Sequence, residues 1–222
     1  MAASIEAPVN QARVGVLGGT FDPLHIGHLI VATELRHALS LDRVLFVPAG
    51  RPPHKADQSI TDNEHRLAML HAALADAPEF EISTVDLDRP EPSYSAVTLE
   101  ILQRLIGPVQ LIFLMGEDSL RDLPDWHEPN LLAERAELGV ATRPGVDVDL
   151  SDLFTAVPAA RGRVHLVEVP EIGISSRNLR TRVADGLPIR YQVPRTVEDY
   201  IRRHRLYLGQ RSQAAHGNRR DV

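Results

Sequence analysis

Short runs of β-branched and other apolar residues alternate along this chain with segments of helical periodicity, and this alternation constrains the fold more than any other feature. Strands separated by helices form βαβ units, whose strands lie side by side in a parallel sheet. The sequence therefore predicts an α/β fold. The predicted strands are residues 13–17, 44–47, 80–85, 109–115, 138–142 and 164–169.

Helical patterns fill the intervals between the predicted strands. Leucines recur on one face over 67–74, and a second apolar stripe covers 98–105. A third stripe, over 197–201, predicts a helical C-terminal part. The pairs Thr61 with Glu64 and Thr196 with Asp199 resemble capping residues at helix starts. We expect one domain over 13–208, with mobile ends over 1–12 and 209–222.

Composition narrows the class of protein. A chain of 222 residues is long enough to bury a sizeable core, and its formal charge of −6 argues against a surface that binds a nucleic-acid polymer. It contains no cysteine, which excludes a thiolate nucleophile and a cysteine metal site. Without a long apolar run or a signal-peptide pattern, we expect a cytoplasmic protein that does not bind membranes. A homo-oligomer is compatible with these features, and the oligomeric state stays open.

A glycine pair, Gly18–Gly19, ends the first predicted strand, and a helical segment starts near Ile26. Glycines let the backbone approach an anion, and the N–H groups and dipole of a helix N-terminus favour negative charge. His25 and His28 are three residues apart, so both rings lie on one side of the first helical turn. Imidazoles there can donate to phosphate oxygens. The alternatives are two structural histidines or a metal pair, but no second ligand pair is evident.

Other polar segments also follow predicted strands: 51–55, 116–118 and Arg143. Ligands of open α/β sheets bind beyond the carboxyl ends of the strands. We therefore expect these segments to share one edge of the sheet with the glycine turn.

Residues 18–28 read G-G-T-F-D-P-L-H-I-G-H. The H-x-G-H pattern resembles the signature of the nucleotidyltransferase superfamily, which includes cytidylyltransferases, pantetheine-phosphate adenylyltransferases and class I aminoacyl-tRNA synthetases. The longer form resembles the bacterial nicotinate-mononucleotide adenylyltransferase family. The resemblance covers about residues 13–207 and implies a Rossmann-like parallel sheet nucleotidyltransferase fold with a small helical C-terminal part.

The resemblance also implies an ATP site. Residues 173–180, G-I-S-S-R-N-L-R, are similar to the family's I-S-S-T-x-x-R motif, in which a helix N-terminus and an arginine bind ATP phosphates. His25, His28 and Arg180 would be the catalytic residues, and Asp118 would accept hydrogen bonds from the ribose. The implied ATP contacts are Gly18, Gly19, Thr20, Phe21, His25, His28, Gly116, Asp118, Ser175, Ser176 and Arg180.

A second set of segments resembles the family's acceptor site. The loop P-P-H-K at 52–55 would neutralise the acceptor phosphate, and the family's tryptophan at the place of Trp126 stacks on a pyridine ring. The chain departs from the family pattern at Arg177 and Val97, where the family has threonine and aspartate. The implied mononucleotide contacts are His54, Lys55, Tyr94, Thr98, Trp126 and Arg143.

The implied reaction joins ATP to nicotinate mononucleotide, giving deamido-NAD and pyrophosphate by in-line attack of the acceptor phosphate. Mg²⁺ would bind mainly through the ATP phosphates, with no metal site built from the protein alone. A transferase acting on pantetheine phosphate is the main alternative, but it has no need of Trp126. A dinucleotide-binding module would need a G-x-G-x-x-G turn, which the Gly18–Gly19 turn does not fit. A tRNA synthetase would need an anticodon-binding region, for which the chain is too short and too acidic.

Overall fold

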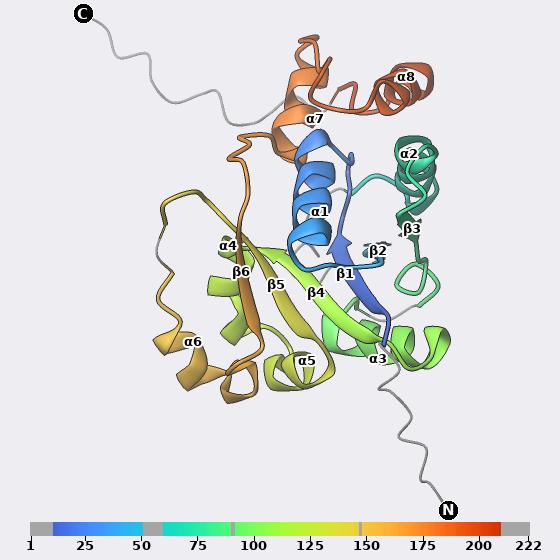
Figure 1. Cartoon of the computed structure of the whole chain (residues 1–222). Coiled ribbons are helices and arrows are strands. Elements are labelled where there is room, and N and C mark those ends of the chain that lie inside the picture. Colours follow the sequence, from blue (N-terminus) through green and yellow to red (C-terminus); the bar gives the residue numbers. More distant parts are fainter. Residues whose placement is uncertain (1–10, 51–59, 90–91, 147, 210–222) are drawn as a thin grey trace, which may run out of the picture.

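The computed structural model describes residues 11–50, 60–89, 92–146 and 148–209. Their centre is a parallel sheet of order β3-β2-β1-β4-β5-β6 (Figure 1). The order reverses direction at β1, which pairs with β2 on one side and β4 on the other. The strands are β1 (Arg13–Gly19), β2 (Arg43–Pro48), β3 (Phe80–Ile82), β4 (Gln110–Gly116), β5 (Glu137–Thr142) and β6 (Val164–Glu168).

Each predicted run forms a strand, so the predicted parallel α/β sheet is confirmed. The largest difference is β3, which ends at Ile82 rather than at residue 85. It pairs only with β2, and the chain then turns, because the Leu87 N–H donates to the Thr84 carbonyl at 2.8 Å.

Helices cover both faces of the sheet (Figure 1). Alternate residues of β4 enter two different apolar clusters: Phe113 packs with residues of α3 and α5, whereas Ile112 packs with residues of α1 and α2. This alternation follows from the period of two in a strand. The helices are α1 (Ile26–Ala38), α2 (Asn63–Leu74), α3 (Ser95–Ile106), α4 (Glu117–Arg121), α5 (Pro129–Arg135), α6 (Ser151–Ala156), α7 (Ser176–Ala184) and α8 (Arg195–His204).

The C-terminal helices form the predicted small helical part. A third apolar cluster joins them to α2 through Met69, Leu179 and Ile201 among other residues. Figure 1 shows α8 beside α2, beyond the carboxyl end of β1. Among the described residues, no helix is both long and apolar enough to cross a membrane.

Both capping predictions are wrong. Helix α2 begins at Asn63 with Asp62 as N-cap and no side-chain cap, and the Thr61 carbonyl accepts a bond from Arg66 Nε at 3.0 Å. Helix α8 begins one residue before Thr196, because the Pro194 carbonyl accepts the first helical bonds from the N–H groups of residues 197 and 198. The predicted stripe over 98–105 also ends early, since Leu105 is exposed.

The predicted mobile ends fall almost entirely on residues 1–10 and 210–222, outside the described residues. The same holds for His54 and Lys55, which lie in the segment 51–59.

Candidate active site

An open cavity of about 920 Å³ lies at the carboxyl edge of the sheet. Its walls come from the ends of β1, β4 and β5 and from the segments that follow β6, which is where ligands of open α/β sheets bind. The cavity brings together many of the residues that the sequence predicts for the site: Gly18, His25, His28, Gly116, Asp118, Trp126, Arg143, Ser175, Ser176 and Arg180.

The two histidines form a stacked pair at the start of α1. Their ring centroids are 3.7 Å apart, with 25° between the planes. His25 is the N-cap residue, and its backbone N–H donates to His28 Nδ1 at 3.2 Å. An Nδ1 atom that accepts a hydrogen bond carries no proton, so the neutral His28 ring has its N–H at Nε2. The backbone thus selects the tautomer of His28.

Burial determines the charge of His25. Its exposed fraction is 7%, and desolvation lowers the pKa of the ring from 6.5 to about 4. His25 is therefore neutral near pH 7. Its Nδ1 atom is buried against the first turn of α1, where the His25 side chain and the His28 backbone N–H form one half of a capping box.

Gly27 lies closely against the His25 ring. A Cβ atom at this position would lie 3.1 Å from two atoms of the His25 ring. The glycine in H-I-G-H therefore lets the His25 ring lie against the first turn of the helix.

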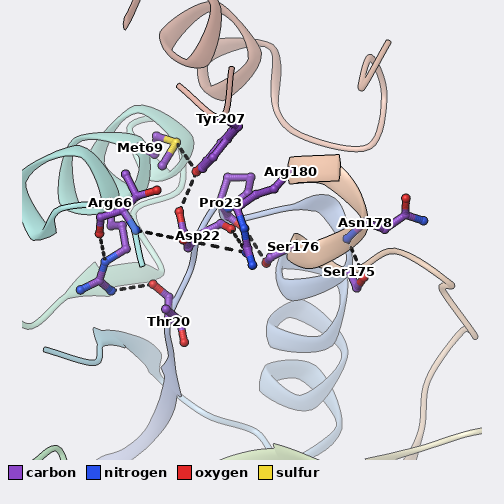
Figure 2. Close-up of polar contacts among 11 residues, drawn as sticks. Thr20, Asp22, Pro23, Arg66, Met69, Ser175, Ser176, Asn178, Arg180 and Tyr207 are labelled. Carbon is purple, nitrogen blue, oxygen red and sulfur yellow. Dashed lines mark hydrogen bonds and ion pairs between the residues drawn. The ribbon is translucent and has the colours of Figure 1, made fainter. Parts of the chain in front are cut away.

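Helix α7 contributes its N-terminus to the cavity (Figure 2). Ser175 is the N-cap, and its hydroxyl accepts from the Asn178 N–H at 3.2 Å. The Ser176 hydroxyl donates to the Pro23 carbonyl at 2.9 Å. Arg180 Nη1 donates to the Asp22 carbonyl at 2.7 Å, so two side chains of α7 bind the loop after β1.

Trp126, Asp118 and Arg143 also line the cavity. Trp126 is half-buried and meets the edge of Phe113, with ring centroids 6.1 Å apart. Asp118, in the first turn of α4, forms an exposed ion pair with Arg121 at 3.3 Å. Arg143 is exposed, and its Nε lies 3.8 Å from a carboxylate oxygen of Glu171. All three predicted residues reach the same cavity.

The remaining described residues of the predicted site lie outside the cavity lining. Thr98 is buried and its hydroxyl donates to Asp86 Oδ1 at 2.7 Å. The Tyr94 ring packs against His127, with centroids 4.1 Å apart. Their proposed contacts with an acceptor stay predictions, as do those of Gly19, Thr20 and Phe21 with ATP.

Sequence reasoning missed a buried charged group behind the cavity. Arg66 is fully buried, and its guanidinium donates to the carbonyls of Thr20 at 2.6 Å and Ala49 at 2.8 Å. Burial lowers its pKa, and the nearby Asp22 carboxylate opposes that shift. The signal was present in the sequence, since Arg66 stands three and four residues before Met69 and Leu70 on the buried face of α2.

In the described residues, no group of three or more histidines and carboxylates is arranged to hold a metal ion.

The sheet order, the glycine turn with its two histidines and the arginine-bearing helix at the same edge define a Rossmann-like nucleotidyltransferase. The model of the cytidylyltransferase-like family matches residues 16–182. The probable nicotinate-nucleotide adenylyltransferase of Thermomicrobium roseum is 59% identical to this chain, over 89% of this chain and 92% of the relative. That of Thermus thermophilus is 43% identical, over 88% of this chain and 99% of the relative. The chain belongs to the nicotinate-nucleotide adenylyltransferase family.

Solved structures support the fold. The nicotinic acid mononucleotide adenylyltransferase of Plasmodium falciparum in complex with NaAD is similar at a TM-score of 0.71 and 21% sequence identity. The similarity covers 88% of this chain and 97% of that chain.

Proposed function

We propose that this protein transfers the adenylyl group of ATP to nicotinate mononucleotide, giving deamido-NAD and pyrophosphate. The observation that carries the proposal is the continuous cavity that joins the histidine pair and Arg180 to Trp126 and Arg143. A cavity that holds both phosphate-binding groups and an aromatic ring with a cation suits two nucleotides that meet at their phosphates. The names of the relatives agree with this assignment.

The phosphate end would act by positioning and charge stabilisation. A 5′-phosphate oxygen of the acceptor attacks the α-phosphorus of ATP, the bond to the bridging oxygen breaks, and pyrophosphate leaves with the bonding electrons. His28 donates from Nε2 and Arg180 donates charge-assisted bonds to the oxygens of the leaving group. The substrate supplies the nucleophilic oxygen, so the protein needs no side-chain nucleophile.

The acceptor end would recognise the pyridine ring. A pyridinium cation stacks favourably on indole, which assigns Trp126 to the ring. Arg143 is close enough to the same cavity to bind a nicotinate carboxylate, which the amide analogue lacks. Asp118 lines the same cavity, and its carboxylate can accept hydrogen bonds from ribose hydroxyls of ATP.

Mg²⁺ would bind through the ATP phosphates and water, because it retains several waters and takes few protein ligands. The side chains at the phosphate end are imidazoles and a guanidinium, which suit phosphate oxygens better than a hard cation. When bound, Mg²⁺ neutralises part of the triphosphate charge. We also assign the protein to the cytoplasm and to free nucleotides rather than a nucleic-acid polymer, in keeping with its charge of −6.

A coupled pyrophosphate assay tests the proposal. With ATP and Mg²⁺, we expect rapid release of pyrophosphate with nicotinate mononucleotide, slower release with nicotinamide mononucleotide, and none with pantetheine phosphate. Turnover with pantetheine phosphate alone would overturn the acceptor assignment and leave nucleotidyl transfer in place. No turnover with any of these acceptors would overturn the proposed function.

A further inference from the structure

A buried carboxylate, Asp22, lies directly behind Arg180 and receives hydrogen bonds from two distant parts of the chain (Figure 2). Its exposed fraction is 3%. The Tyr207 hydroxyl donates to Oδ1 at 2.8 Å, and the Thr61 N–H donates to Oδ2 at 3.2 Å. The C-terminal part of the chain therefore touches the loop that carries the histidine pair.

Arg180 lies closer to the backbone carbonyl of Asp22 than to its carboxylate. Its Nη1 atom donates to the Asp22 backbone carbonyl at 2.7 Å, whereas the nearest carboxylate oxygen, Oδ2, is 3.9 Å away. A guanidinium has several N–H donors, and the bond to the carbonyl uses one of them. The side chain is largely buried yet lines the cavity, so its other donors are available to an anion there.

The charges around Asp22 do not cancel. Arg66 is a second guanidinium close enough to influence this carboxylate, but its hydrogen bonds within the described residues go to carbonyl groups and Asn63 rather than to Asp22. One carboxylate thus faces two guanidinium groups, Arg66 and Arg180. Of the two, only Arg180 lines the cavity.

Tyr207 is held firmly in this arrangement. Its side chain is 6% exposed, and its φ of +66° lies in the left-handed region that favours glycine. A bulky residue adopts this conformation only where its surroundings impose it. Burial and the Asp22 carboxylate raise the pKa of the hydroxyl, which therefore stays protonated and donates.

We propose that Tyr207 and Asp22 are positioning residues that keep Arg180 available for the triphosphate. The Tyr207 hydroxyl and the Thr61 N–H satisfy the carboxylate, so it attracts Arg180 without forming a close ion pair. The carbonyl of Asp22 then fixes one nitrogen of the guanidinium, and the remaining donors point to the cavity. This inference rests on the proposed function, which assigns the triphosphate to Arg180.

Loss of the hydroxyl would change this balance. A buried carboxylate that loses a donor is poorly solvated, and the nearest cation compensates. In Tyr207→Phe, that cation is Arg180, which lies 3.9 Å from Oδ2 and moves toward the carboxylate group and away from the phosphates. ATP affinity should therefore fall, whereas the mononucleotide should be nearly unaffected.

Calorimetric titration with ATP in a double-mutant cycle tests the proposal. We expect Tyr207→Phe to weaken ATP binding about tenfold in the wild-type background, with less than about a twofold change for nicotinate mononucleotide. In an Arg180→Ala background, the same substitution should change ATP affinity less than about twofold. In a second cycle, Tyr207→Phe is placed in an Asp22→Asn background, where it should also change ATP affinity less than about twofold.

Tyr200→Phe is the matched control. The Tyr200 hydroxyl also joins the C-terminal part to α2, through His65 Nδ1 at 3.0 Å, but does not touch Asp22. We expect wild-type ATP affinity for this variant.

An unchanged ATP affinity in Tyr207→Phe, or an equal loss in the wild-type and Arg180→Ala backgrounds, would overturn the proposal and leave Tyr207 a structural residue. If Tyr207→Phe does not fold, a double-mutant cycle of Asp22→Asn with Arg180→Ala tests the proposal instead.

In that cycle, Asp22→Asn should alter ATP affinity only where Arg180 is present, and equal effects in both backgrounds would overturn the proposal. Because ATP affinity is measured without an acceptor, a wrong acceptor assignment does not affect this result. Failure of the wild-type protein to bind ATP would contradict the proposed function itself.

Discussion

At the residue scale, the backbone determines the tautomer of His28 and the position of the His25 ring. The His25 N–H fixes the tautomer of His28, and the close turn at Gly27 lets the His25 ring stack on its neighbour. Burial keeps His25 neutral. A neutral imidazole costs less to bury than a cation.

The lowered pKa of His25 predicts a pH-dependent stability. The unfolded chain binds a proton at His25 below pH 6.5, whereas the folded chain does so only near pH 4. Above pH 6.5, His25 does not affect how the free energy of unfolding depends on pH. As the pH falls from 6.5 to about 4, the folded state loses about 1.4 kcal/mol per pH unit relative to the unfolded state. From pH 7.5 to pH 5, His25→Gln should therefore lose about 2 kcal/mol less than the wild-type protein. Urea denaturation at several pH values measures the difference, and equal slopes for the two proteins would contradict the neutral, buried assignment.

Trp126 provides the residue-scale test of the acceptor end. It is the only tryptophan in the chain, so its fluorescence reports binding directly. We expect nicotinate mononucleotide to quench it saturably and pantetheine phosphate to leave it unchanged. Trp126→Ala should raise the mononucleotide KM through loss of about 0.5–2 kcal/mol of cation–π attraction, with ATP binding nearly intact. A large drop in Tm with equal losses for both substrates would instead show that Trp126 serves the core.

At the element scale, the N-caps of α7 and α8 differ, although both helices have a serine or threonine near their start. The Ser175 side chain caps α7, but Thr196, which the sequence predicts as a cap, does not cap α8, because Pro194 already ends the extended segment before it. We expect Ser175→Ala to reduce the free energy of unfolding by about 1 kcal/mol. Thr196→Ala, the matched control, should change it by less than about 0.5 kcal/mol. Equal losses in urea denaturation would contradict the observed caps.

The strands and the position of the cavity were largely predictable, because both follow from the apolar runs along the chain. Apolar runs such as 109–115 are long enough to identify strands, and parallel order places their carboxyl ends at one edge. Residues that follow those runs, including His28, Asp118 and Arg143, could therefore be assigned to one site. The contacts of Asp22 with Tyr207 and Arg180 span 185 and 158 residues. No local pattern encodes such pairs, because they depend on how α2, α7 and the C-terminal segment pack together.

At the scale of the whole molecule, three apolar clusters stabilise different parts of the structure. Two fill the space between the sheet and its helices, and the third joins α2 to α7 and α8. The third cluster lies beyond the carboxyl edge of the sheet, next to the buried charges at Asp22. It thereby couples the stability of the C-terminal part to the geometry of the phosphate end.

Ile201→Ala tests this coupling. Ile201 is 3% exposed in the third cluster, so its truncation should lower the free energy of unfolding by about 2–4 kcal/mol. Leu208→Ala is the control in the same segment, because Leu208 is 59% exposed, and we expect a change of less than about 0.5 kcal/mol. Urea denaturation followed by circular dichroism and by Trp126 fluorescence should give one coincident transition for the wild-type protein. If Ile201→Ala shifted only the circular-dichroism signal and left the Trp126 transition unchanged, the C-terminal helices would unfold as a separate unit. The third cluster would then not couple them to the site.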